Sequence, residues 1–275
     1  MVVNHLLREL APLSADAWDE VDREARSRLT TYLAARKLID FGGPHGWRLS
    51  STSTGRTAIV GAAPADGVLA RQRRVVSAVE LRATFTVSRA ELADIDRGAV
   101  DVDLESLDEA ARQIALAENV AVFHGFAEAG IVGIAQASSY AAAPLGEAFV
   151  DYPASVAAAV NMLRLAGVEG PFGLALSPAG YTGVVETTEF GGHVVLHHLN
   201  EILGGPIVWA PGIEGAVVVS LRGGDFLFES GQDLSVGYLD HDATSVTLYI
   251  EESFTFRVAD GDAAIALKTG TTTAP

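Results

Sequence analysis

The sequence of 275 residues contains no cysteine. A disulfide framework and a thiolate metal site are therefore excluded, while a cytoplasmic location fits. Positive charge is also scarce, since 19 Lys and Arg face 35 Asp and Glu and the formal net charge is -16 at pH 7. Because a phosphate backbone needs a concentrated basic face, this composition argues against general nucleic-acid binding.

Long hydrophobic runs are missing as well. The longest apolar stretches, such as residues 154–160 around Ser155, fall far short of the roughly 20 residues that cross a bilayer. Residues 1–13 carry charged side chains within their apolar stretch, so no secretory signal peptide and no membrane span are expected. What the chain does have is 49% hydrophobic residues, enough to bury the core of one large domain or of two intermingled ones.

Helical periodicity is clearest near the N-terminus. Ser14 is a suitable cap, Asp16 suits the positive end of a helix, and apolar residues then recur at spacings of three and four. These apolar residues are Trp18, Val21, Ala25, Leu29 and either Tyr32 or Leu33. Further helices are predicted over 107–121, where residues 106–109 have the capping-box form, over 153–165 and over 193–203.

Alternating or continuous apolar runs predict strands in a mixed α+β chain. They cover residues 47–49, 75–87, 207–210, 216–221, 246–250 and 254–258. The run Gly-Gly-Asp-Phe at 223–226 superficially resembles the signature of cyclic-dinucleotide synthases. It lacks the following Glu, so a tight turn between two strands is the better interpretation.

Residues 42–74 have too few large apolar side chains to form a core of their own. A two-stranded arm of this kind is marginal alone in water. It is either a mobile surface insertion or an excursion that packs on a neighbouring copy, and we favour the second. The basic run at 71–74 could contact nucleic acid, but ion pairs with a neighbour's carboxylates are the better interpretation.

The densest set of possible metal ligands is His193, His197 and His198, with Glu186, Glu189 and Glu201 nearby. On a helix, His193 and His197 would share a face as metal ligands do. The general-base Glu of the zincin motif is missing between them, so a solvated or pore-lining histidine group is favoured over a metal site. No serine-nucleophile or phosphate-binding motif is present. A hydrolase centred on His193 and His197 stays open as an alternative function.

Six runs, in the same order along the chain, resemble the family 1 encapsulins, the linocin- or bacteriocin-like shell proteins of nanocompartments. They are AARKLID at 34–40, GPHGW at 43–47, VELRATFT at 79–86, GVEGPF at 167–172, GGDFLFESGQDLSVGY at 223–238 and EESFTF at 251–256. The resemblance extends from residues 10–13 to residues 264–267, which is almost the whole chain.

The resemblance implies an α+β fold of the Hong Kong 97-type phage major capsid class. This fold has a peripheral domain, an extended loop and an axial domain. Residues 1–49 would hold the N-terminal helix and the first part of the peripheral domain, and 50–74 the extended loop. The peripheral domain would continue over 75–136, the axial domain would cover 137–222, the C-terminal peripheral strands 223–268, and a disordered tail 269–275.

The resemblance also implies two functional sites. A groove for a cargo protein's targeting peptide would involve Leu29, Leu33, Arg36, Asp40, Leu234, Val236 and Tyr238. A five-fold pore would be lined by Thr187, Thr188, Glu189, Phe190, Gly191, Gly192 and His193. Because the Glu189 side chain would repeat around the ring, the pore is expected to favour cations or small neutral molecules over anions.

The function implied is that of a structural shell protein without enzymatic activity. Roughly sixty copies would close into an icosahedral compartment in the cytoplasm, around a cargo enzyme that carries a C-terminal targeting peptide. The cargo would be a dye-decolourising peroxidase or a ferritin-like iron oxidase, with roles in oxidative stress or iron storage. This chain would need no cofactor and no metal, and iron or haem would belong to the cargo. A prophage capsid protein that packages DNA is the remaining alternative.

Overall fold

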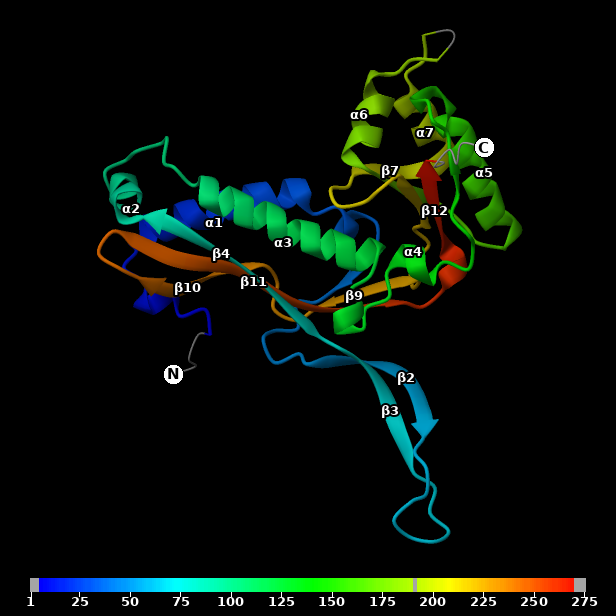
Figure 1. Cartoon of the computed structure of the whole chain (residues 1–275), viewed down its shortest axis with the longest axis horizontal. Coiled ribbons are helices and arrows are strands. Elements are labelled where there is room, and N and C mark those ends of the chain that lie inside the picture. Colours follow the sequence, from blue (N-terminus) through cyan, green and yellow to red (C-terminus); the bar gives the residue numbers. More distant parts are fainter. Residues whose placement is uncertain (1–4, 190–191, 270–275) are drawn as a thin grey trace, which may run out of the picture.

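The computed structural model describes residues 5–189 and 192–269. It consists of a sheet covered by two long helices, a second lobe with its own sheet, and an arm that projects away from both (Figure 1). In the described part of the chain, no helix has the length and apolar character needed to cross a membrane.

The first sheet is built around the long strand β11 (Ser245–Val258). Its neighbours are β10 (Ser235–His241), β4 (Val79–Ser88) and β9 (Phe226–Ser230), all antiparallel to it, and β1 (Asp40–Gly42) pairs in parallel with β9. The separate strands predicted at 246–250 and 254–258 are therefore one strand. The strand predicted at 47–49 is wrong, because Trp47 lies outside the sheet and its ring stacks on that of His5. The chain joins the sheet earlier, at β1, where the Phe41 ring stacks on that of Phe228.

Helices α1 (Ala15–Tyr32) and α3 (Glu105–Phe123) lie against one face of this sheet, with α2 (Arg89–Asp96) at its far end (Figure 1). The α1 prediction is confirmed, because Ser14 Oγ accepts a hydrogen bond from the Ala17 N–H at 3.0 Å and the α1 stripe is buried. The capping box at 106–109 is wrong, since α3 begins one residue before Ser106 and the Ser106 hydroxyl donates to the Thr86 carbonyl instead. Helix α2 was not predicted.

The second sheet has the strand order β5 (Ala143–Leu145), β12 (Ala264–Thr269), β8 (Ala216–Ser220), β6 (Phe172–Leu176) and β7 (Gly204–Trp209). Strands β6 and β8 are buried at every residue. Around them pack α4 (Ile134–Ala137), α5 (Tyr152–Leu165), α6 (Pro178–Glu186) and α7 (Val195–Leu203).

Strand β12 corrects the expected division of the chain. Residues 223–268 were expected to belong with the first sheet, but β12 pairs with β8 and β5 in the second. Its residues Ala264 to Leu267 are buried, so the C-terminal strand completes the core of the second lobe. Thr269, expected in the tail, ends this strand, and residues 270–275 lie outside the described residues.

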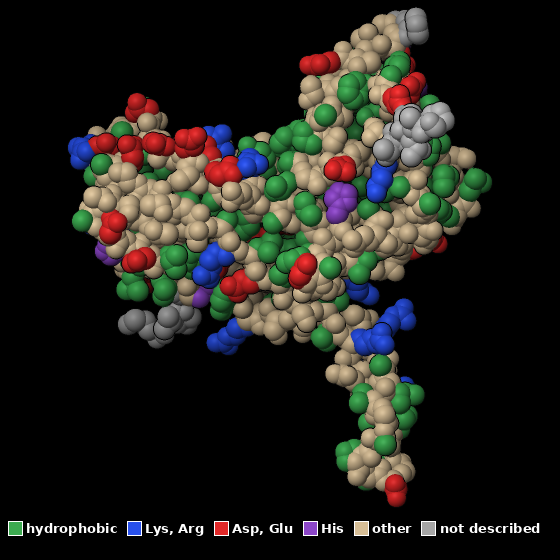
Figure 2. Space-filling model, viewed as in Figure 1, with side chains coloured by type: hydrophobic (Ala, Val, Ile, Leu, Met, Phe, Trp, Pro, Cys, Tyr) green, Lys and Arg blue, Asp and Glu red, His purple; other side chains and the backbone are tan. Residues whose placement is uncertain are grey.

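The arm consists of β2 (Ser51–Ile59) and β3 (Arg71–Ser77), which, among the described strands, pair only with each other (Figure 1). Hydrophobic side chains are distributed along it (Figure 2), and Ile59 and Leu69 are 66% and 63% exposed. At its base the hydroxyls of Thr52 and Thr255 lie 2.9 Å apart. The root of the arm is therefore at most half-buried against the first sheet. The rest of the arm has no core of its own, as predicted.

Short 3-10 helices complete the described fold. They are η1 (Arg8–Leu10), η2 (Ala35–Lys37), η3 (Ala127–Ala129), η4 (Phe149–Asp151) and η5 (Gly261–Ala263). Of these, η2 bears on function, because it follows the end of α1 and carries Arg36.

Candidate functional site

A groove of about 400 Å³ lies between α1 and β10, and we call it the α1–β10 groove. It is lined by Leu6, Arg8, Asp22, Ala25, Arg26, Leu29, Thr30, Leu33, Arg36, Asp233, Leu234, Ser235, Val236 and Ile250. Five of the seven residues predicted for the cargo groove are in this lining: Leu29, Leu33, Arg36, Leu234 and Val236. The sequence-based prediction thus names residues that the fold brings together, and peptide binding itself stays a prediction.

The other two predicted residues lie elsewhere. The Asp40 carboxylate accepts a hydrogen bond from the Gly224 N–H at 2.8 Å and holds the turn before β9. Tyr238 is buried in the core beneath α1, with its hydroxyl 2.5 Å from His241 Nδ1. Asp40 is outside the groove lining because it belongs to β1, which pairs with β9. Tyr238 is outside it because its ring is part of the hydrophobic core. A role of either residue in peptide binding stays a prediction.

The N-terminal segment forms a wall of the groove that sequence reasoning missed. The Leu6 carbonyl accepts a hydrogen bond from the Tyr238 N–H at 2.8 Å, which attaches this segment to the edge of β10. The His5 ring stacks on Trp47 at 4.0 Å, and the Tyr249 hydroxyl donates to the His5 carbonyl at 3.3 Å. Nothing in residues 5–10 has strand or helix periodicity, so no local pattern indicated this position.

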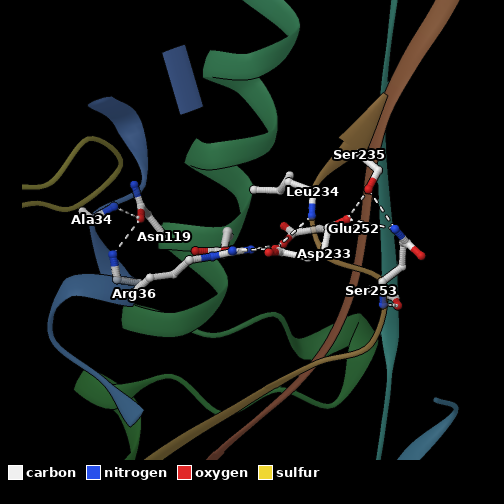
Figure 3. Close-up of polar contacts among 11 residues, drawn as sticks. Ala34, Arg36, Asn119, Asp233, Leu234, Ser235, Glu252 and Ser253 are labelled. Atoms are coloured by element: carbon white, nitrogen blue, oxygen red, sulfur yellow. Dashed lines mark hydrogen bonds and ion pairs between the residues drawn. The ribbon is translucent and has the colours of Figure 1, made fainter. Parts of the chain in front are cut away.

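The polar end of the groove is the Arg36 cluster, which consists of Arg36, Glu118, Asp233 and Glu252. Arg36 donates from Nε to Glu118 at 2.7 Å, and its two terminal nitrogens reach Asp233 at 2.7 Å and Glu252 at 2.8 Å. Figure 3 shows the guanidinium extended toward Asp233 and Glu252. One side chain therefore ties η2 to α3, to the turn before β10 and to β11.

Burial dominates the electrostatics of this cluster. The side chains of Glu118 and Glu252 are 0% and 1% exposed. Burial, and next the neighbouring Glu118 carboxylate, raise the pKa of Glu252 well above its usual range, although Arg36 acts against this. Burial lowers the pKa of Arg36, but the buried carboxylates outweigh that effect and raise it overall. Arg36 is therefore a permanent cation, and its surroundings disfavour the ionised form of Glu252.

Asn119 fixes the backbone on which the Arg36 cluster stands. Its Oδ1 accepts from the N–H groups of Ala34 and Ala35 at 2.9 and 3.1 Å, as Figure 3 also shows. Its Nδ2 donates to the carbonyls of Tyr32 and Pro211 at 2.9 and 3.1 Å. Glu118 and Asn119 were overlooked in the sequence. The available signal was two adjacent polar residues inside an otherwise alanine-rich helix.

The opposite rim of the groove is held by a second ion pair. Arg8 donates to both carboxylate oxygens of Asp22 at 3.0 and 2.8 Å, and its guanidinium lies 3.9 Å from the centroid of the Trp18 ring. Between the two rims apolar side chains such as Leu29 and Leu33 lie among polar ones from Arg26, Thr30 and Ser235. A slot with a few apolar positions and charged ends is suited to an extended peptide with a few apolar anchors.

The predicted pore segment forms a turn between α6 and α7. Thr188 and Val194 make an isolated bridge, and Glu189 Oε1 lies 2.9 Å from His198 Nδ1. Phe190 and Gly191 lie outside the described residues, whereas Thr187, Gly192 and His193 are described and belong to the turn. The copies that would surround a pore are not part of a single chain, so the pore stays a prediction.

The helix predicted from residue 193 begins instead at Val195, so His193 and His197 do not share a helical face. His197 lies 3.5 Å from Glu201, and His198 pairs with Glu189. Among the described residues no group of three or more His, Asp or Glu side chains is placed to hold a metal ion. The arrangement on which the hydrolase alternative depended is therefore absent from the described segment.

Comparison with known proteins agrees with the sequence resemblance. Residues 3–255 match a family model described as "Encapsulating protein for peroxidase". The chain is 49% identical to a type 1 encapsulin shell protein of Rhodospirillum rubrum, over 97% of each chain. It is 41% identical to the type 1 encapsulin shell protein of Mycobacterium tuberculosis, over 96% of this chain and 99% of that one.

Solved structures extend the comparison to the fold. A virus-like particle from Pyrococcus furiosus aligns with a TM-score of 0.62 at 17% identity, covering 91% of this chain and 99% of that chain. The capsid of an empty GTA particle aligns with a TM-score of 0.54 at 16% identity, covering 87% and 90%. The α+β fold is thus the predicted phage-capsid class. The family model that matches most of its length and the 49% identity to a full-length relative show that the chain belongs to the encapsulin shell-protein family.

Proposed function

We propose that this chain assembles with identical copies into a closed icosahedral compartment of roughly sixty subunits, located in the cytoplasm. Its relatives are named as shell proteins, and we infer the same non-enzymatic role here. The observation that carries the assembly proposal is the arm, whose strands pair only with each other and whose apolar side chains stay exposed. A neighbouring copy would supply the missing contacts, and the basic run at 71–74 would pair with its carboxylates.

Electron microscopy of the purified full-length protein tests assembly directly. Uniform hollow spheres are expected by negative stain, together with a single large species in mass photometry. A folded monomer that persists at micromolar concentration would contradict the proposal. The prophage alternative makes a different prediction, since its particles would contain DNA, whereas an acidic shell of this family should be free of nucleic acid.

The enclosed cargo would be held by a short C-terminal targeting peptide in the α1–β10 groove. The supporting observation is that apolar side chains from α1 and β10 line one slot whose ends are charged. Several grooves in one shell would act together on a multimeric cargo and raise its avidity. The family description points to a peroxidase as cargo. A ferritin-like iron oxidase is the second candidate, and in both cases haem or iron would belong to the cargo.

A pair of matched substitutions tests the groove. Leu33→Asp places a charge among the apolar anchors, and Val100→Asp places the same charge at a side chain that is 97% exposed and outside the groove lining. Shells of both variants should form. The cargo that co-purifies with wild-type shells from the native cell should be lost with Leu33→Asp and kept with Val100→Asp. Mass spectrometry identifies that cargo, and deleting its C-terminal residues should abolish its enclosure. Equal cargo in both variants would contradict the groove assignment.

The turn around Glu189 would face the five-fold opening and favour cations over anions. Each copy contributes one Glu189 carboxylate, which His198 holds at 2.9 Å. Shells carrying Glu189→Gln should take up ferrous iron more slowly than wild-type shells with the same cargo. Unchanged uptake would remove the support for this assignment.

A further inference from the structure

Two carboxyl groups are buried together at the polar end of the α1–β10 groove. Glu118 comes from α3 and Glu252 from β11, and each points its Oε2 oxygen at the Arg36 guanidinium. The Oε1 oxygen of each is buried and receives no hydrogen bond from the described residues. An unsatisfied buried polar group costs about 1–3 kcal/mol, and more when it is charged. Two such oxygens on the carboxyl groups of one guanidinium therefore need an explanation.

The charges of the site also fail to balance when both carboxyl groups are ionised. Arg36 supplies one positive charge, and Asp233, the remaining charged member, is 42% exposed and partly in contact with water. The adjacent residue of β11, Glu251, pairs with Arg82 at 2.7 Å, so this cation is engaged there. In the described part of the chain, Arg36 is the cation within ion-pair distance of Glu118 and Glu252.

One proton removes both defects. Placed between the two carboxyl groups, it neutralises one of them and supplies a donor for an oxygen that has none. Carboxyl groups that share a site cannot both ionise easily, because like charges at close range disfavour each other. The neighbouring Glu118 carboxylate raises the pKa of Glu252, in addition to the larger effect of burial.

We propose that Glu118 and Glu252 hold one shared proton at neutral pH, and that release of this proton at raised pH loosens the polar end of the α1–β10 groove. The cluster joins four segments: η2, α3, the turn before β10, and β11. Loss of the proton leaves a buried negative charge that Arg36 cannot balance. Water can reach that charge most easily beside Asp233, because Asp233 is the exposed member of the cluster. The neighbouring Leu234 and Ser235 at the groove rim therefore open first. The consequence for cargo rests on the proposed function, whereas the proton site does not.

Infrared spectroscopy of intact shells tests the proton itself. At neutral pH exposed carboxyl groups are ionised, so the carbonyl stretch of a protonated carboxylic acid reports buried groups alone. Wild-type shells should show this band, and Glu252→Gln shells should lose it. The matched control is Asp108→Asn, because burial also raises the pKa of Asp108, which is outside the groove lining. The band assigned to the shared proton should survive in that variant. Absence of the band in wild-type shells, or its persistence in Glu252→Gln, overturns the proposal.

Hydrogen exchange on the same intact shells tests the opening. After correction for intrinsic exchange rates, amides over 233–236 should lose about tenfold in protection per pH unit as pH rises toward the release of the proton, and should level off above it, since opening is linked to the loss of one proton. Glu252→Gln, which has the shape of the protonated acid, should keep constant protection, and negative stain confirms that its shells form. A wild-type profile as flat as that of Glu252→Gln overturns the coupling. Neither measurement uses cargo. Failure of the shared-proton proposal is therefore distinguishable from failure of the groove to bind a peptide.

Discussion

Replacing Arg36 with methionine removes the single cation that the buried carboxyl groups share. The Arg36 side chain is 15% exposed and lies 2.6 to 2.8 Å from oxygens of Glu118, Asp233 and Glu252. Asp233 is partly solvated and contributes about 0–1 kcal/mol. The two buried groups dominate, because removing one partner of a buried pair costs about 3–5 kcal/mol. We therefore expect Arg36→Met to lower the free energy of unfolding by about 3–5 kcal/mol.

The loss should depend on pH in a defined direction. The folded-state pKa of Glu252 lies above its unfolded value of 4.5, so its protonated form stabilises the fold below that value. This stabilisation is lost as pH rises through the folded-state pKa. Without Arg36, Glu252 escapes the penalty by holding its proton, which becomes harder as pH rises. The destabilisation by Arg36→Met should thus be larger at higher pH.

Urea unfolding at equal subunit concentration, followed by tryptophan fluorescence, measures the effect, because assembly couples stability to concentration. The triple variant Arg36→Met, Glu118→Gln and Glu252→Gln removes every buried charge of the cluster and should recover most of the loss. Arg36→Lys keeps the charge without the planar fork that reaches three carboxylates, and should be intermediate. A loss below about 1 kcal/mol at high pH, or a triple variant as unstable as Arg36→Met, would refute the reasoning.

Three further predictions concern other parts of the chain. Asn119→Ala removes four hydrogen bonds to buried or half-buried backbone groups and should cost about 3 kcal/mol or more, whereas the exposed Asn200→Ala should cost little by the same urea assay. Hydrogen bonds from the Thr244 and Ser245 backbone lower the pKa of Asp242 to about 2. The ionised Asp242 carboxylate therefore stabilises the fold fully above pH 3.8, and this stabilisation is lost as pH falls through about 2. The melting temperature of Asp242→Ala should therefore fall less than that of the wild type as pH is lowered. The same fall in both proteins would contradict the assignment. Replacing Arg71, Arg73 and Arg74 together with serine should leave the chain folded, as measured by circular dichroism, but unable to form spheres in negative stain. Normal spheres would show that the arm does not dock through charge.

Local patterns predicted the parts of the fold that depend on neighbours in the sequence. The α1 stripe and its Ser14 cap, the end of α5 and the lack of a core in the arm all follow from spacing and composition, because helix periodicity and burial are coupled over a few residues. The capping box at 106–109 failed for the opposite reason. Ser106 has a tertiary partner, the Thr86 carbonyl, which local pattern could not reveal.

The sequence by itself determined the family, the α+β class and five of the residues that line the α1–β10 groove. The tertiary structure alone decided that β12 completes the second sheet, that Leu6 walls the groove, and that Asp40 and Tyr238 lie outside it. It also decided that Arg36 meets Glu252, a partner 216 residues away. Contacts at that separation depend on strand order and on which face of β11 is covered. A buried charge pair leaves no periodic mark, because each partner is a single polar residue in an otherwise apolar element.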